Sequence, residues 1–245
     1  PMAATVPEAE AMVAACEASG VVYGTAFDQR FHAAHRRIRS INASGTLGTV
    51  CSVRIHYACW LPPDWDADNW RADPYRAGGG AFMDLAPHGL DLVQYLLDDE
   101  IAEVRCLVQR RVHDYAVEDG AALVGSTAGG VLVLQHVSYN TPEKYPRRTL
   151  EIIGTSAMAV ATDTLGQDAG GTLDLIRAAD GRRERIEIPP DEDRPPFLAQ
   201  VEAFSDRLLG DEDAWPFPPG RDLRTMYLIS AALEDAGEKL ERSAI

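Results

Sequence analysis

The pattern of apolar and polar positions predicts helices near both ends of the chain and a large sheet between them. Four segments have the periodicity and composition of helices: 7–19, 32–43, 197–209 and 223–241. The nearly continuous apolar run 21–27 predicts a short strand that is buried on both faces. The chain therefore opens with helix, buried strand and helix, the material of an α/β fold.

The middle of the chain changes to a period of two, which is typical of strands with one covered face. Strands are predicted over 49–57, 102–112, 121–126, 131–139, 149–153, 158–161, 172–177 and 183–188. This order predicts an α/β (α+β) fold with a mostly antiparallel open sheet and helices on one face. The uncovered face is expected to be the interface of a homo-oligomer. His136 alternates with apolar neighbours and is expected on the solvent face.

Composition narrows the class of protein. The chain has 245 residues with 46% hydrophobic and 25% charged residues, as in ordinary globular proteins. Its formal net charge of -15 argues against nucleic acid and anionic membranes as partners. No apolar run approaches the ~18 residues of a membrane span, and no signal peptide is recognised. The scattered cysteines predict reduced thiols in a cytoplasmic protein, with no metal site.

The most informative segment is 78–91 (GGGAFMDLAPHGLD). Three glycines allow another group to approach the backbone closely. Asp84, His88 and Asp91 then follow at helical spacing, so all three are able to line one stripe of a helix. A stripe of carboxylates and an imidazole beside a glycine-lined opening is suited to proton transfer, and the segment is a candidate active site.

A structural interpretation of the same residues is also open. Pro87 favours the first turn of a helix, which predicts a helix that begins near Leu85. Asp84 would then be its N-cap, accepting a hydrogen bond from a free backbone N–H. On this interpretation His88 has a structural role only, as a partly buried histidine. The capping and catalytic roles of Asp84 are compatible.

Several segments together resemble the glucose–fructose oxidoreductase / inositol dehydrogenase / rhizopine catabolism (Gfo/Idh/MocA) family. They are 27–32 (FDQRFH), 45–48 (GTLG), 69–73 (NWRAD), 78–91 and 151–155 (EIIGT). The resemblance implies an NAD- or NADP-dependent oxidoreductase of sugars, cyclitols and related small polyols. It also implies a Rossmann domain followed by a mostly antiparallel domain, with residues 1–28 as a remnant of the first and 29–245 as the second.

By the same resemblance Asp84 and His88 inherit the catalytic roles, and Trp70, Arg71 and Asp73 belong to the segment that shapes the substrate pocket. We expect His88 to be the general acid/base and Asp84 to orient either His88 or the substrate hydroxyl. Asp91 on the same stripe and Tyr145 on a loop after a predicted strand are further candidates for substrate contact.

The sequence also departs from the family pattern. The catalytic lysine of the family's Glu-Lys-Pro motif would stand immediately before Pro1, and no Gly-x-Gly-x-x-Gly fingerprint occurs in these residues. We therefore expect most of the cofactor domain to be missing from this sequence. Gln29 and Arg30 follow the predicted strand 21–27 and are candidates for contact with the nicotinamide, although Arg30 is equally compatible with a surface salt bridge.

Two other functions remain open at this point. One is a non-redox or self-recycling reaction on the same scaffold, such as glycoside cleavage or epimerisation. The other is a non-catalytic module for ligand binding or oligomerisation. The Asp84/His88 pair favours an enzyme over the second of these.

Overall fold

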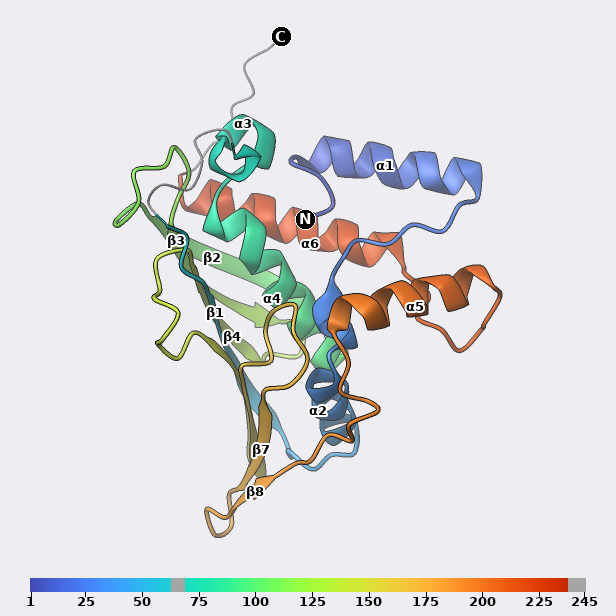
Figure 1. Ribbon diagram of the computed structural model, residues 1–245, viewed down its shortest axis with the longest axis vertical. Helices are drawn as coiled ribbons and strands as arrows, with labels where there is room; N and C mark the ends of the chain where they lie inside the picture. Colours follow the sequence, from blue (N-terminus) through green and yellow to red (C-terminus); the bar gives the residue numbers. More distant parts are fainter. Residues whose placement is uncertain (63–68, 238–245) are drawn as a thin grey trace.

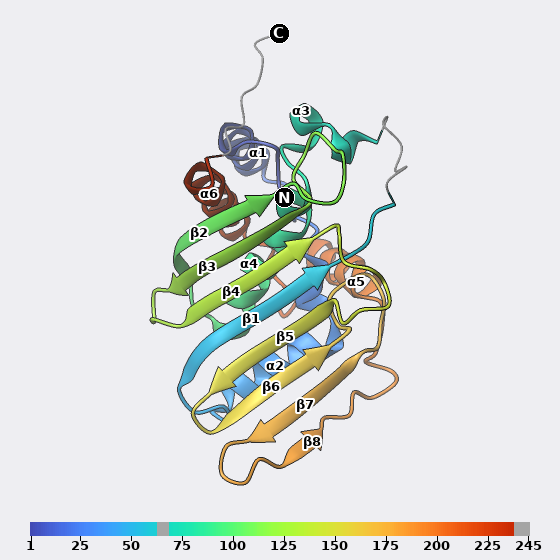
Figure 2. The same ribbon diagram turned by 90° about the vertical axis from the view of Figure 1, so that its left-hand side faces the viewer.

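The computed structural model describes residues 1–62 and 69–237, which build an eight-stranded sheet with helices on one of its faces (Figures 1 and 2). The strand order is β2-β3-β4-β1-β5-β6-β7-β8. Strands β1 and β4 are parallel at the centre, and every other neighbouring pair is antiparallel. This confirms the predicted α/β (α+β) class and the mostly antiparallel open sheet.

All the predicted strands of the sheet are present, with small shifts at their ends. They are β1 (Val50–Ala58), β2 (Ile101–Gln109), β3 (Gly120–Thr127), β4 (Leu132–Ser138), β5 (Arg148–Gly154), β6 (Ala157–Thr162), β7 (Thr172–Arg177) and β8 (Arg183–Arg185). Strands β2 and β8 end three residues earlier than predicted.

The helices are α1 (Val6–Ser19), α2 (Ala33–Ala43), α3 (Pro74–Ala77), α4 (Ala81–Leu97), α5 (Pro196–Leu208) and α6 (Pro219–Asp235), with short 3-10 turns η1 (Asp28–Phe31) and η2 (Trp70–Ala72). The last part of the predicted helix 223–241 lies outside the described residues. Within the described ranges, no helix is both long enough and apolar enough to cross a membrane.

Helix α4 is the central helix of the covered face (Figure 1). Its apolar side chains, including Leu85, Leu92 and Leu96, are buried against the sheet, and α4 contacts β4 and β1 directly. Gly89 permits this close approach, because a Cβ there would lie 2.2 Å from the Gln135 amide of β4. The Gln135 Nε2 donates to the Ala86 carbonyl at 3.2 Å and links helix to sheet.

The prediction that α4 begins near Leu85, with Asp84 as N-cap, is wrong. The helix begins at Ala81, and Pro87 lies in its interior, where it removes one backbone hydrogen bond. Glu118, which precedes β3, replaces a local cap: its Oε1 accepts from the backbone N–H groups of Gly80 at 2.7 Å and Phe82 at 3.0 Å. Glu118 lies 38 residues after Gly80, so the sequence around the start of the helix does not indicate this cap.

The triple glycine serves this packing. A Cβ on Gly80 would lie 2.1 Å from the Glu118 carbonyl oxygen, so the group that approaches the glycine here is the protein's own backbone. Gly78 has φ 79°, a left-handed conformation that ends α3 and favours glycine.

The prediction of a buried strand over 21–27 is also wrong. This segment has no regular secondary structure, and no described strand pairs with it. Val21 is 57% exposed, whereas a strand of this apolar character requires neighbours that cover its backbone and both faces.

Replacing Glu118 by alanine is expected to lower the free energy of unfolding by about 2–6 kcal/mol, because two buried N–H groups lose their acceptor at roughly 1–3 kcal/mol each. Glu118→Gln keeps the Oε1 acceptor and should lose less. Urea denaturation measures both variants. Equal midpoints for wild type and Glu118→Ala would contradict the capping role.

Burial raises the pKa of Glu118. The folded protein therefore binds this proton more tightly than the unfolded chain, so its contribution to stability falls as pH rises through the pKa of Glu118. Denaturation of the Glu118→Gln variant should show a smaller loss of stability over the same pH range.

Candidate active site

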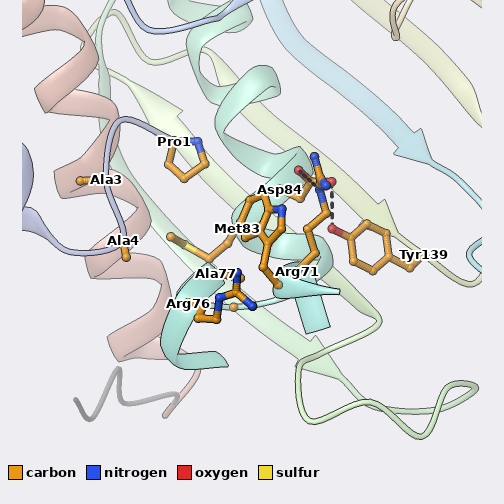
Figure 3. A pocket seen from close by; sticks show the side chains of 11 residues that line it. Pro1, Ala3, Ala4, Arg71, Arg76, Ala77, Met83, Asp84 and Tyr139 are labelled. Atoms are coloured by element: carbon orange, nitrogen blue, oxygen red, sulfur yellow. Dashed lines mark hydrogen bonds and ion pairs between the residues drawn. The ribbon is translucent and has the colours of Figure 1, made fainter. Parts of the chain in front are cut away.

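Asp84 and His88 lie one turn apart on α4, as their spacing predicts. Asp84 opens to a cavity of about 140 Å³, whose lining includes Trp70, Arg71, Met83 and Tyr139 (Figure 3). The cavity wall is formed by the loop before α1, by η2 and α3, and by the start of α4. The structure thus brings Asp84, Trp70 and Arg71 together around one opening.

Tyr139 is the direct partner of Asp84. Its hydroxyl donates to Asp84 Oδ2 at 2.8 Å, shown by the dashed line in Figure 3. Burial and the nearby Asp84 charge raise the pKa of Tyr139 well above its ordinary value, which keeps the phenol protonated as a donor. Tyr139 follows β4, and nothing in its sequence context distinguishes it from an ordinary core tyrosine.

Arg71 supplies positive charge at the same opening. Its Nε lies 4.0 Å from Asp84 Oδ1, and its guanidinium stacks over the Trp70 ring at 4.6 Å. Both side chains of the Arg71–Asp84 pair are about four-tenths exposed, so solvent screens their attraction. Trp70 is 44% exposed and holds an apolar face beside the two charges.

His88 has a different carboxylate partner, Asp28. The His88 Nδ1 lies 3.3 Å from Asp28 Oδ1, without meeting hydrogen-bond geometry, and the Asp28 side chain is only 2% exposed. The ring is held by edge-on contacts with Phe27 and Tyr57, whose centroids lie 5.9 and 6.2 Å away. The His88 side chain remains 22% exposed. Asp28 belongs to the segment 27–32 of the family resemblance, but nothing in the sequence indicates that it faces His88, which lies 60 residues later.

Gln29 and Arg30 are buried in the structure. Gln29 Nε2 donates to Asp28 Oδ2 at 2.8 Å and to the Gly166 carbonyl at 2.9 Å. Its side chain therefore fixes the carboxylate next to His88. With only 1% of its surface exposed, Gln29 is not accessible to a nicotinamide in this arrangement.

Arg30 and Asp91 form a buried ionic cluster with Asp222 of α6. Arg30 Nε donates to Asp91 Oδ2 at 2.7 Å, and its NH2 group donates to Asp222 Oδ1 at 2.7 Å. Arg221 adds a donor to Asp91 Oδ1 at 3.4 Å. Asp91 is fully buried, so its carboxylate serves the cluster and is closed to substrate, and Arg30 is likewise closed to a cofactor.

The two remaining candidates, Asp73 and Tyr145, do not line the cavity. Asp73 is the N-cap of α3, and its side chain accepts from the backbone N–H groups of Tyr75 and Arg76. Tyr145 is 63% exposed on the loop after β4 and is not part of the cavity lining. Among the residues that the structure describes, no group of three or more His, Cys, Asp or Glu side chains is arranged to hold a metal ion.

Comparison with known proteins agrees with this architecture. The family model of the GFO/IDH/MocA C-terminal domain matches residues 35–160. The 1,5-anhydro-D-fructose reductase of Ensifer adhaerens is 31% identical over 75% of this chain and 54% of its own length. The chain thus spans about half the length of this relative.

Solved structures share the fold. The aldose–aldose oxidoreductase of Caulobacter crescentus, complexed with glycerol, superposes with a TM-score of 0.84 at 23% identity, covering 97% of this chain and 68% of the other. A levoglucosan dehydrogenase in complex with NADH and levoglucosan gives a TM-score of 0.81 at 20% identity, with coverage of 97% and 70%.

Replacing Asp91 by alanine is expected to destabilise the protein by about 3–5 kcal/mol, since it leaves the buried Arg30 guanidinium without its main counter-charge. Thermal or urea unfolding measures this loss. The substitution Asp73→Ala, which removes only the cap of a short helix, should cost about 1 kcal/mol. A stable Asp91→Ala variant with weakened ligand binding would instead restore the substrate role.

Proposed function

Because the chain belongs to the GFO/IDH/MocA family, we propose that it is the substrate-binding part of an NAD(P)-dependent oxidoreductase. The substrate in this proposal carries a hydroxyl or carbonyl group on a sugar, a cyclitol or a related small molecule. The observation that carries the proposal is the placement of Asp84 and His88 one turn apart on α4, each with a separate partner. The names of the sugar-oxidising and sugar-reducing relatives support this class of substrate.

His88 is the proposed general acid/base. Alcohol oxidation releases a proton from oxygen, and imidazoles as a class exchange protons near neutral pH. Nδ1 is the buried nitrogen and faces Asp28, which leaves Nε2 as the nitrogen for the substrate oxygen. Asp28 stabilises the imidazolium that forms when His88 accepts the proton, and Gln29 holds Asp28 in place.

Asp84 acts on the substrate itself in this proposal. Its carboxylate already accepts the Tyr139 hydroxyl, and its exposed side faces the cavity beside Arg71. It therefore accepts a hydrogen bond from a substrate hydroxyl and orients the reacting carbon. The Trp70 ring offers an apolar face to the C–H surface of a polyol.

In this proposal the described residues make only a limited contribution to dinucleotide binding. A phosphate cradle of the Gly-x-Gly-x-x-Gly type is absent from the sequence, and the two candidates for cofactor contact, Gln29 and Arg30, are buried. A nicotinamide would supply the hydride acceptor in this proposal. In the proposal, residues 1–28 belong to the dinucleotide-binding part and 29–245 to the substrate part.

The open face of the sheet is proposed to bind a second copy of the chain. Figure 2 shows this face without helices over it. Large apolar side chains are exposed there on the adjacent strands β2, β3 and β4: Leu107 at 77%, Val124 at 54%, Leu132 at 58% and Leu134 at 41%. A contiguous apolar patch on a chain of net charge -15 favours a specific interface over non-specific association.

Replacing His88 by glutamine is expected to lower turnover about 100-fold or more, because the proton acceptor is lost while polarity and size are retained. Initial rates, followed by nicotinamide absorbance with a panel of sugars and cyclitols, measure the effect. Lys144→Met, on the exposed loop after β4, is the matched control and should retain wild-type turnover. Unchanged turnover in His88→Gln would remove His88 from the mechanism.

Replacing Leu107 by arginine is expected to shift the chain from dimer or larger oligomer to monomer, because a charge would be buried in the proposed interface. Light scattering coupled to size-exclusion chromatography measures the mass. Leu209→Arg, at the end of α5 and 86% exposed, introduces the same charge on the helical side and should leave the mass unchanged. A monomeric wild type would refute the interface.

A further inference from the structure

Two histidines lie side by side on the open face of the sheet, opposite to the helices that carry the candidate active site. His56 of β1 and His136 of β4 are direct partners in the parallel pairing of these strands. Their chain neighbours Ile55, Tyr57 and Val137 are buried beneath the helices, so strand alternation places both imidazoles on the other face. The two ring centroids are 4.9 Å apart, with an angle of 45° between the ring planes.

This separation matches two imidazoles that share one metal ion. A metal about 2.0 Å from a ring nitrogen lies about 3.2 Å from the ring centroid. Two rings that meet at such an ion at roughly 90–109°, the square-planar and tetrahedral angles, have centroids about 4.5–5.2 Å apart. The observed 4.9 Å lies within this interval.

At least one ring nitrogen of this pair has no protein partner in the part of the chain that the structure describes. His56 Nε2 is buried and has no hydrogen-bond partner among the described residues. The next residues along the same row are Thr149 on β5 and Ala122 on β3, so the row contains no charged group beside the rings. Burial lowers the pKa of both histidines, and the His136 charge lowers that of His56 further. Neutral imidazoles each offer one lone pair to a metal.

A second close pair of histidines, His32 and His35, differs from this pair in its hydrogen bonding. The rings of His32 and His35 are also 4.9 Å apart, but both nitrogens of His35 and the Nδ1 of His32 are engaged, and only His32 Nε2 has no partner among the described residues. His35 bonds the Gln29 carbonyl and the Thr164 hydroxyl, and His32 Nδ1 accepts from a backbone N–H. Both of these rings are buried in the protein interior.

We propose that His56 and His136 form a two-imidazole site for a divalent transition metal of the zinc, copper and nickel class. Imidazole nitrogen suits these ions, whereas Mg²⁺ and Ca²⁺ prefer oxygen ligands. The site does not rest on the proposed oxidoreductase function.

Titration of the chain with Zn²⁺ near neutral pH, followed by calorimetry, tests the site. We expect one binding event in wild type and none with Mg²⁺. His136→Gln and His56→Gln should each weaken Zn²⁺ binding by roughly tenfold or more, at least the loss caused by removing an outer-shell partner of a metal site. Cys51→Ala removes an exposed thiol of β1 and should leave the affinity unchanged.

Zn²⁺ binding that is equally strong in His136→Gln and wild type, or that disappears in Cys51→Ala, would overturn the site. Proton NMR of the wild type gives a second measurement that is independent of variant folding. Substoichiometric Zn²⁺ should perturb the imidazole resonances of His56 and His136 and leave those of His32 and His35 unchanged. The opposite pattern, or no perturbation of any histidine, would also refute the proposal.

Discussion

The buried guanidinium of Arg30 is the interaction on which the rest of the site depends. It joins η1 to α4 through Asp91 and to α6 through Asp222, and its side chain is only 2% exposed. The guanidinium also packs against the Phe27 and Trp215 rings, with centroids 5.3 and 5.1 Å away. A buried charge of this kind is tolerated only when its counter-charges and hydrogen bonds are complete. The three segments are therefore held in one fixed arrangement.

The position of Asp28 follows from that arrangement. Asp28 stands two residues before Arg30 in the same 3-10 turn, so the ionic cluster that anchors Arg30 also places the Asp28 carboxylate beside His88. Asp91 lies on α4 three residues after His88, which ties the other side of the contact to the same cluster. A buried structural network thus sets the geometry of a more exposed chemical group.

The two faces of the sheet have separate tasks. Helix α4 is packed onto the inner face, where Gly80 and Gly89 allow Glu118 and Gln135 to approach its backbone. The outer face keeps its apolar side chains and the His56–His136 pair accessible in the single chain. Successive side chains of a strand point to opposite faces of the sheet, so adjacent residues of the same strand serve these two tasks.

The sequence alone determined the local elements and the one-turn spacing of Asp84 and His88, because periodicity and composition are local properties. The segment 21–27 shows the limit: an apolar run predicts a strand only if partner strands are present to pair with it. Tertiary structure alone decided that Tyr139 pairs with Asp84, that Asp28 faces His88, and that Asp91 and Arg30 are buried together. These partners lie 55 to 61 residues apart in the chain. Their meeting depends on how helices pack on the sheet, which no local pattern records.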